Sequence, residues 1–128
     1  ECYEGSIWEA AMFASHNRLN NLVAIVDRNH LGVTNFTENM VELEPFDEKW
    51  KSFGWNVVNI NGHSFEEILH ALEDIRSRKF SKPIVIIADT VKGKGISFMC
   101  YQPLWHAVVP RGKQVLDAKE ECRGEECI

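Results

Sequence analysis

Asn29 follows a short apolar run of residues, at a position where its side-chain oxygen could bind a cation. The run, Leu22 to Asp27, predicts a strand, and residues that follow parallel strands lie at the sheet edge where open α/β folds bind their ligands. Magnesium prefers oxygen ligands and usually shares phosphate oxygens with one or two protein groups. The position therefore indicates a metal site that faces a phosphate group. The alternative is a plain turn, because Asn tolerates left-handed backbone geometry and Gly32 follows it.

The segment Lys92 to Gly95, with the sequence Lys-Gly-Lys-Gly, directly follows another apolar run, Ile84 to Thr90. Glycines let backbone N–H groups approach an anion, and a lysine adds a compact positive charge. An ordinary turn is the alternative for this segment. His106 comes after Trp105, in a stretch that starts from the same sheet edge, and its imidazole could transfer a proton near neutral pH. The alternative is a loop histidine without a chemical role.

Glu4 and Glu9 are candidate acidic residues at the start of a predicted helix. Residues 6–19 carry Ile7, Ala10, Ala11 and Ala14 at helical spacing. Ser6 and Glu9 predict a capping box at the helix start, which accounts for Glu9 through capping and the helix dipole. Capping accounts for Glu4 less well, so Glu4 stays a candidate for chemistry.

The elements alternate between helix and strand along the chain. Asp47 to Phe53 predicts a short helix, Trp55 to Ile60 predicts a strand, and Ser64 with Glu67 predicts a capping box that opens a longer helix. The two apolar runs described above are apolar at both odd and even positions, so we expect those strands to be covered on both faces. The pattern predicts a doubly wound, mostly parallel α/β sheet flanked by helices. The long loop from Arg28 to about Pro45 is a candidate functional segment.

Length and composition indicate one globular domain and exclude several classes of protein. The chain has 128 residues, is 45% hydrophobic and carries a formal charge of -5. This charge argues against a nucleic-acid surface, and no apolar stretch is long enough to cross a membrane. Cys2, Cys100, Cys122 and Cys127 lack the spacing of a zinc site, so we expect free thiols and a cytoplasmic location. Because the chain starts at Glu1, and the strand expected ahead of it is missing, we expect a fragment, a trimmed product or one part of a split polypeptide.

Several separated stretches together resemble the N-terminal, thiamine diphosphate-binding domain of the transketolase family. They are Glu4 to Ala10, Val26 to Gly32, Phe53 to Trp55, Asn61 to Ser64, Thr90 to Ile96 and Trp105-His106. The resemblance covers nearly all of the chain up to Pro110. It implies that residues 1–112 are a partial diphosphate-binding (PP) domain whose first strand is missing, and that residues 113–128 are a charged tail that begins as a surface helix.

The resemblance also implies roles for single residues. The side chain of Asn29 and the main-chain carbonyl of Leu31 would bind a divalent metal, Mg²⁺ or else Ca²⁺ or Mn²⁺, that bridges the diphosphate of thiamine diphosphate. Lys92 matches a family residue near the cofactor. His106 matches a histidine that contacts the diphosphate region and helps to deprotonate or orient the donor sugar. Glu4 and Glu9 match glutamates of a proton relay across the subunit interface.

The sequence departs from the family pattern in three places. The Gly-Asp-Gly turn that supplies the metal's carboxylate would end immediately before Glu1. The domain that binds the aminopyrimidine ring is absent, and Ala107 stands where the family usually has Gly. We therefore expect the isolated chain to bind the cofactor poorly and to be inactive. A second chain or domain would supply the missing parts, in a dimer or a hetero-oligomer.

By this resemblance, the expected function is transfer of a two-carbon ketol unit between sugar phosphates, as in pentose phosphate metabolism. Two alternatives stay open. One is a component of another thiamine diphosphate carboligase or lyase, and the other is a non-catalytic subunit that retains the fold.

Overall fold

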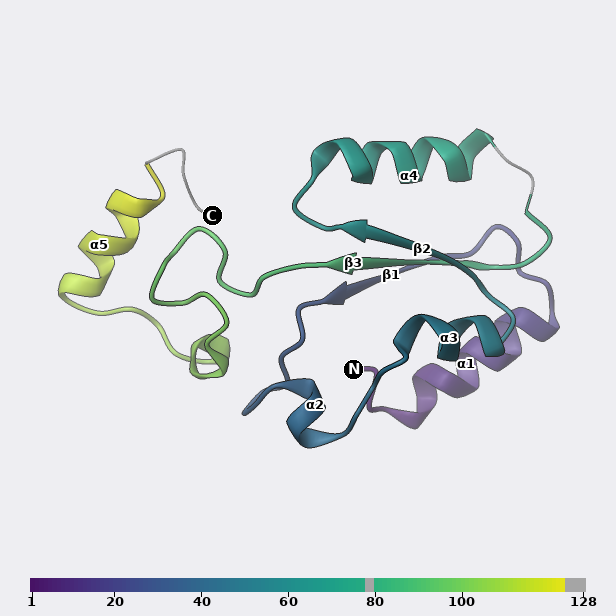
Figure 1. The fold of residues 1–128 in the computed structure, drawn as a ribbon, viewed down its shortest axis with the longest axis horizontal. Coiled ribbons are helices and arrows are strands. Elements are labelled where there is room, and N and C mark those ends of the chain that lie inside the picture. Colours follow the sequence, from purple (N-terminus) through teal and green to yellow (C-terminus); the bar gives the residue numbers. More distant parts are fainter. Residues whose placement is uncertain (78–79, 124–128) are drawn as a thin grey trace. The chain divides into compact units, whose positions relative to one another are not determined.

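The centre of the fold is a parallel sheet of three strands in the order β1-β3-β2 (Figure 1). The computed structural model describes residues 1–77 and 80–123. The strands are β1 (Val23–Arg28), β2 (Asn56–Asn61) and β3 (Ile84–Asp89). Strand β3 pairs with both neighbours, so that Ile84 lies opposite Val23 on one side and Asn56 on the other. This sheet, with helices between its strands, confirms the predicted fold class.

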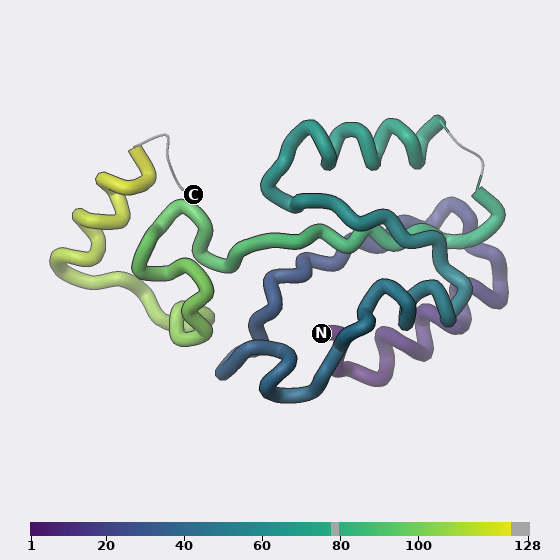
Figure 2. Tube along the Cα trace, in the orientation of Figure 1, coloured from purple at the N-terminus to yellow at the C-terminus, as the bar shows by residue number. Residues whose placement is uncertain are grey.

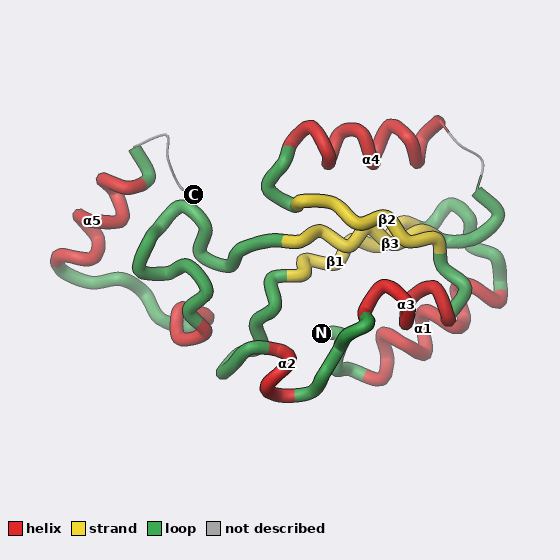
Figure 3. The backbone as a smooth tube through the Cα atoms, viewed as in Figure 1, coloured by secondary structure: helices red, strands yellow, loops and turns green. Residues whose placement is uncertain are grey.

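Helices cover both faces of this sheet, as Figures 1 and 2 show: α4 lies on one face, and α1 and α3 lie on the other. Figure 3 shows how the helices and strands alternate along the chain. The helices are α1 (Gly5–His16), α2 (Thr37–Met40), α3 (Phe46–Ser52), α4 (Phe65–Ser77) and α5 (Lys113–Glu121), with a 3-10 turn, η1 (Pro103–His106). The predicted surface helix near the C-terminus is confirmed over Lys113–Glu121, whereas the rest of the predicted tail, from residue 124 with Cys127, lies outside the described residues. No helix in the described ranges has the length and apolar character needed to cross a bilayer.

The chain divides into two compact units. The first unit contains residues 1–28 and 43–90, which form the sheet with α1, α3 and α4. The second unit contains residues 29–42 and the chain from residue 91 onward, with α2, η1 and α5. The boundary predicted after residue 112 stays a prediction.

Strand β3 is buried along its length, but β1 is covered on one face alone. The side chains of Ile84 to Ala88 are all buried, as predicted for a central parallel strand. In β1, Ala24 and Val26 pack against the core cluster, whereas Ile25 is 66% exposed. The prediction that both faces of β1 are covered is wrong for this structure. The physical reason is that α4 packs against β2, so no helix of the described residues covers the face of β1 that carries Ile25.

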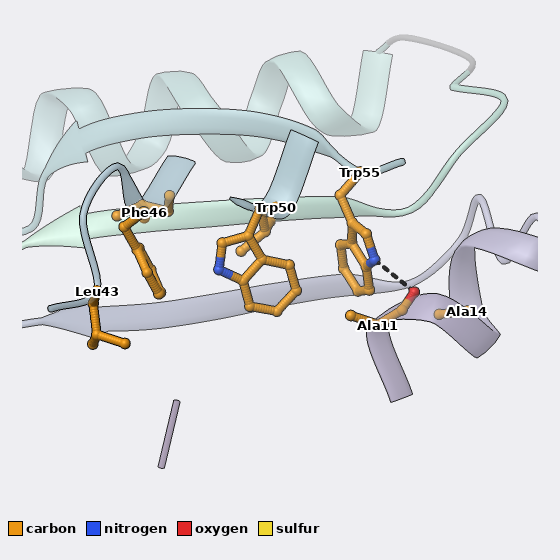
Figure 4. Close-up of a cluster of buried hydrophobic side chains, with 8 residues drawn as sticks. Ala11, Ala14, Leu43, Phe46, Trp50 and Trp55 are labelled. Atoms are coloured by element: carbon orange, nitrogen blue, oxygen red, sulfur yellow. Dashed lines mark hydrogen bonds between the residues drawn. The ribbon is translucent and has the colours of Figure 1, made fainter. Parts of the chain in front are cut away.

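The core between the sheet and helices α1 and α3 is built from aromatic rings. The ring of Trp50 lies 5.2 Å from that of Trp8 and 5.1 Å from that of Trp55, measured between centroids. The indole N–H of Trp55 donates a hydrogen bond of 3.0 Å to the carbonyl of Ala11, shown as a dashed line in Figure 4. The small side chains of Ala11 and Ala14 are buried and let α1 approach these rings. The cluster therefore attaches α1 and α3 to the same face of the sheet.

The two predicted capping boxes have different outcomes. Helix α1 begins at Gly5 with Glu4 as its N-cap residue and no side-chain cap bond, so the predicted Ser6–Glu9 box is wrong. Ser6 lies inside the first turn of this helix, where it cannot act as the cap. In front of α4, the hydroxyl of Ser64 accepts the N–H of Glu67 at 3.2 Å, as predicted. The reciprocal bond of the box is replaced: the carboxylate of Glu67 accepts the N–H of Asn61 at 2.7 Å, and the N–H of Ser64 donates to the Asn61 carbonyl.

Surface ion pairs reinforce α3 on its exposed side. The ammonium of Lys51 lies 2.8 Å from the carboxylate of Asp47 and 2.7 Å from that of Glu48. These hydrogen bonds raise the pKa of Lys51 to about 12, and the bond from Lys51 lowers the pKa of Asp47. Such solvent-exposed pairs contribute little to folding stability.

We expect Gly54→Ala to destabilise the protein by about 1–3 kcal/mol. Gly54 ends α3 with φ at +86°, and a Cβ there would lie 2.3 Å from the Ser15 hydroxyl oxygen. Urea unfolding followed by tryptophan fluorescence measures the free energy of unfolding. Gly5→Ala is the control, because a Cβ at Gly5 meets nothing within 4 Å. Equal unfolding free energies for the two variants would contradict the prediction.

Candidate functional site

Asn29 begins a tight turn immediately after β1. Its side-chain oxygen Oδ1 accepts the N–H of Leu31 at 3.0 Å. The left-handed residue of this turn is His30, with φ at 60°, and not Asn29. The structure therefore contains the turn that was the alternative explanation for Asn29. It is compatible with a metal role, because an amide oxygen that accepts one N–H can still bind a cation through its second lone pair.

The segment after Asn29 closes on itself through hydrogen bonds that do not use the Leu31 carbonyl. Thr37 donates both its N–H, at 2.9 Å, and its hydroxyl, at 3.3 Å, to the carbonyl of His30. The N–H of Gly32 donates to the carbonyl of Asn35 at 2.7 Å. Within residues 1–77 and 80–123, no hydrogen bond ends on the Leu31 carbonyl. The turn therefore presents an amide oxygen and a main-chain carbonyl oxygen two residues apart.

Lys92 lies in a loop whose backbone bonds are mostly internal. The carbonyl of Lys92 accepts the N–H of Tyr101 at 3.1 Å, which closes the loop. The N–H of Lys94 donates to Val91, and the N–H of Ile96 donates to the carbonyl of Gly93. Two of the backbone donors around the Lys-Gly-Lys-Gly segment are therefore occupied by turns. The side chain of Lys92 is half-buried and supplies the positive charge of this loop.

His106 ends the 3-10 turn η1, which Trp105 anchors. The indole N–H of Trp105 donates to the carbonyl of Phe98 at 2.9 Å, and the two rings lie 5.3 Å apart between centroids. Trp105 is half-buried, whereas His106 and the following Ala107 are exposed. The anchored tryptophan thus fixes the backbone that presents an accessible imidazole.

Glu4 and Glu9 both lie on α1, in the first unit. Both side chains are exposed, and Glu4 has extended backbone geometry as the N-cap residue. The other four predicted site residues are Asn29, Leu31, Lys92 and His106, which all belong to the second unit.

The ends of β1 and β3 are joined by a contact that sequence patterns did not reveal. The Thr90 hydroxyl donates a hydrogen bond to the carboxylate of Asp27, and the N–H of Thr90 donates to the carbonyl of Arg28 at 3.3 Å. The parallel register places Arg28 opposite Asp89. The segment that carries Asn29 and the one that carries Lys92 therefore both begin at the carboxyl ends of neighbouring parallel strands. Open α/β folds bind their ligands at these strand ends.

The donor set at this edge fits a hard cation better than zinc. No group of three or more His, Cys, Asp or Glu side chains gathers as a metal site in the described part of the chain. The Asn29 amide oxygen and the Leu31 carbonyl oxygen suit Mg²⁺ when phosphate oxygens complete its shell.

Comparison with known proteins decides the family. The sequence model of the family described as transketolase, thiamine diphosphate binding domain, matches residues 1–115. The chain belongs to this family. This match confirms the resemblance drawn from the motifs and assigns residues 1–115 to a thiamine diphosphate-binding domain of the transketolase type.

Relatives with assigned names are transketolases or transketolase subunits. The chain is 42% identical over 125 residues to an apulose-4-phosphate transketolase subunit from Actinobacillus succinogenes, covering 98% of this chain and 45% of that protein. It is 46% identical over 98 residues to a 6-deoxy-6-sulfo-D-fructose transketolase subunit from a Clostridium species, covering 77% and 35%. It is 38% identical to human transketolase, covering 83% of this chain and 16% of the human protein. This transketolase domain therefore spans less than half the length of these relatives.

Solved structures agree with this assignment. The transketolase of Campylobacter jejuni superposes with a TM-score of 0.85 at 30% identity, covering 95% of this chain and 19% of that one. A transketolase from Pichia stipitis superposes with a TM-score of 0.82 at 23% identity over 94% of this chain and 18% of its own, which shows the shared fold.

We expect Gly93→Ala to open the Lys92 loop more than Gly95→Ala does. Both glycines have left-handed φ values, +78° and +105°, so both variants carry a backbone cost. A Cβ at Gly93 would also lie 2.5 Å from the Met99 carbonyl oxygen, whereas a Cβ at Gly95 meets nothing within 4 Å. Hydrogen exchange of the Tyr101 amide should accelerate roughly tenfold more in Gly93→Ala. Equal acceleration in both variants would show that the close approach to Met99 has no influence.

Proposed function

We propose that this chain forms the diphosphate-binding part of a transketolase that transfers a two-carbon ketol unit between anionic sugars. The observation that carries the proposal is the turn at the end of β1, which presents two oxygens two residues apart: the Asn29 amide oxygen and the Leu31 carbonyl, to which no described residue donates a hydrogen bond. Membership in the family supports it. Thiamine diphosphate would supply the carbon nucleophile that carries the ketol unit.

In this proposal, Asn29 Oδ1 and the Leu31 carbonyl bind a divalent cation, with Mg²⁺ as the first candidate and Ca²⁺ or Mn²⁺ as substitutes. Both are hard oxygen ligands, and neither carries a charge. A cation bound to diphosphate oxygens therefore needs a carboxylate from elsewhere, which a Gly-Asp-Gly turn outside this chain would supply.

Lys92 and His106 act on the anionic groups and on protons. The ammonium of Lys92 compensates phosphate charge near the cofactor. His106 orients a hydroxyl of the donor sugar and accepts its proton, for which its exposed imidazole is accessible. Glu4 and Glu9 pass protons across an interface with a second chain.

The proposal includes a partner, because this chain spans 45% of a relative that is itself named as one subunit of a transketolase. A second chain or domain would bind the aminopyrimidine ring, in a dimer or a hetero-oligomer.

The named substrates of the relatives differ, apulose 4-phosphate in one and 6-deoxy-6-sulfo-D-fructose in another. Both carry an anionic group, so the proposed substrates are phosphorylated or sulfonated sugars. Assays of the assembled protein with xylulose 5-phosphate and ribose 5-phosphate, and with these two sugars, separate the possibilities.

We expect Asn29→Ala to weaken Mg²⁺-dependent binding of thiamine diphosphate to the assembled protein at least about tenfold. The physical reason is the loss of one of two protein oxygen ligands that this chain offers. Calorimetry with thiamine diphosphate at fixed Mg²⁺ measures the affinity. Asn39→Ala is the matched control, since Asn39 is an exposed amide of the same unit and its side chain bonds to Asn35 at 3.3 Å.

The result that contradicts this role is equal affinity in Asn29→Ala and the parent protein. A non-catalytic role for the chain predicts, in addition, that His106→Ala leaves the ketol-transfer rate of the assembly unchanged.

A further inference from the structure

The segment that carries Asn29 and Leu31 leaves the first unit after Arg28 and returns to it at Leu43. Both flanking residues are buried, with Arg28 6% exposed and Leu43 8% exposed. A buried arginine at the end of an apolar strand is unusual, because removing a guanidinium from water costs free energy unless the charge is paired. The partner of the Arg28 guanidinium is therefore important for how the ends of this segment are held.

Arg28 is paired with a residue at the returning end of the same segment. Its Nη2 lies 2.8 Å from Oε1 of Glu44, and its guanidinium carbon lies 5.3 Å from the centroid of the Phe46 ring. The second carboxylate oxygen of Glu44, Oε2, accepts the N–H of Phe46 at 2.8 Å. One carboxylate thus joins the last residue of β1 to the first turn of α3.

Further bonds fix both ends to the rigid layer of the first unit. The carbonyl of Arg28 accepts the N–H of Thr90, next to the end of β3, at 3.3 Å. The ammonium of Lys49 donates to the carbonyl of Leu43 at 2.6 Å and to that of Glu44 at 3.4 Å. The two ends of the segment are therefore held together across its base, and the Arg28–Glu44 contact is a side-chain ion pair that spans it.

In this pair Arg28 is 6% exposed and Glu44 is 54% exposed, whereas in the ion pairs of α3 the lysine is exposed. Arg28 is buried, so removing Glu44 would leave a buried charge without this carboxylate, which is strongly destabilising locally. Lys51 is 47% exposed, and its pairs with Asp47 and Glu48 are surface contacts of small energetic value. Lys51, on the helix that follows Glu44, therefore provides a surface ion-pair control.

We propose that the Arg28–Glu44 pair positions the segment of residues 29–42 by fixing the distance between its two ends. Both partners belong to the first unit, and the pair acts through the backbone that leads into the Asn29 turn. Its relevance to the cofactor rests on the function proposed above, while its effect on the segment does not.

Hydrogen exchange of the protein without ligands tests the first part. Arg28→Met keeps an apolar side chain over Phe46 and removes the charge, and Glu44→Ala removes its partner. In both, exchange of the Gly32 and Thr37 amides, which close the segment, should accelerate roughly tenfold while the Ile86 amide of β3 keeps its rate. Glu44→Gln keeps one of the two acceptor oxygens and loses the negative charge, so it should accelerate exchange less than Glu44→Ala does, and Lys51→Met should change nothing.

Two exchange results would overturn the proposal. One is an unchanged rate at Gly32 and Thr37 in Arg28→Met and Glu44→Ala. The other is equal acceleration at these amides and at Ile86, because that pattern is loss of general stability and not release of one segment.

The second part uses the assembled protein with Mg²⁺ and thiamine diphosphate. Arg28→Met should raise the KM for thiamine diphosphate roughly tenfold and leave kcat at saturation within about twofold, since positioning affects binding more than the reacting groups. Faster exchange with an unchanged KM would overturn the link to the cofactor. If the parent assembly does not bind thiamine diphosphate at all, the proposed function fails, and the exchange experiment alone still decides whether the pair positions the segment.

Discussion

The pairing of β3 with two parallel neighbours is the constraint on which the rest of this structure depends. Its backbone pairs with β1 on one side and β2 on the other, and its side chains from Ile84 to Ala88 are buried. Parallel strands end at one edge, so the segments that follow them begin close together. The bond from the Thr90 hydroxyl to Asp27 ties this edge together at the point where the candidate site begins.

The sheet with its covering helices and most of the predicted site residues belong to different units of the chain. The first unit contains the sheet, the aromatic cluster around Trp50 and the helices that cover the sheet. The second unit contains Asn29, Leu31, Lys92 and His106 in turns and a 3-10 segment. This division follows a general pattern in which loops carry binding residues and a scaffold fixes where the loops begin.

Hydrogen bonding within the loops limits which groups can serve a ligand. The amides of Lys94 and Ile96 are used in turns, so the anion contact proposed for this loop rests on the Lys92 charge and on the remaining backbone N–H groups. In the Asn29 turn, the internal bonds use the carbonyl of His30 and leave the Leu31 carbonyl without one among the described residues. The proposed cation site thus depends on a backbone carbonyl that the internal hydrogen bonds of the turn do not use.

The sequence by itself determined the alternating elements, the parallel sheet, the glycine at the end of α3 and the position of Asn29 after a strand, because these depend on local periodicity and turn chemistry. Only the tertiary structure decided that Ile25 is exposed, since that depends on where α4 packs. It also decided that Arg28 pairs with Glu44, 16 residues away. Such contacts are set by the packing of distant segments, and no local pattern encodes which distant partner a buried charge will meet.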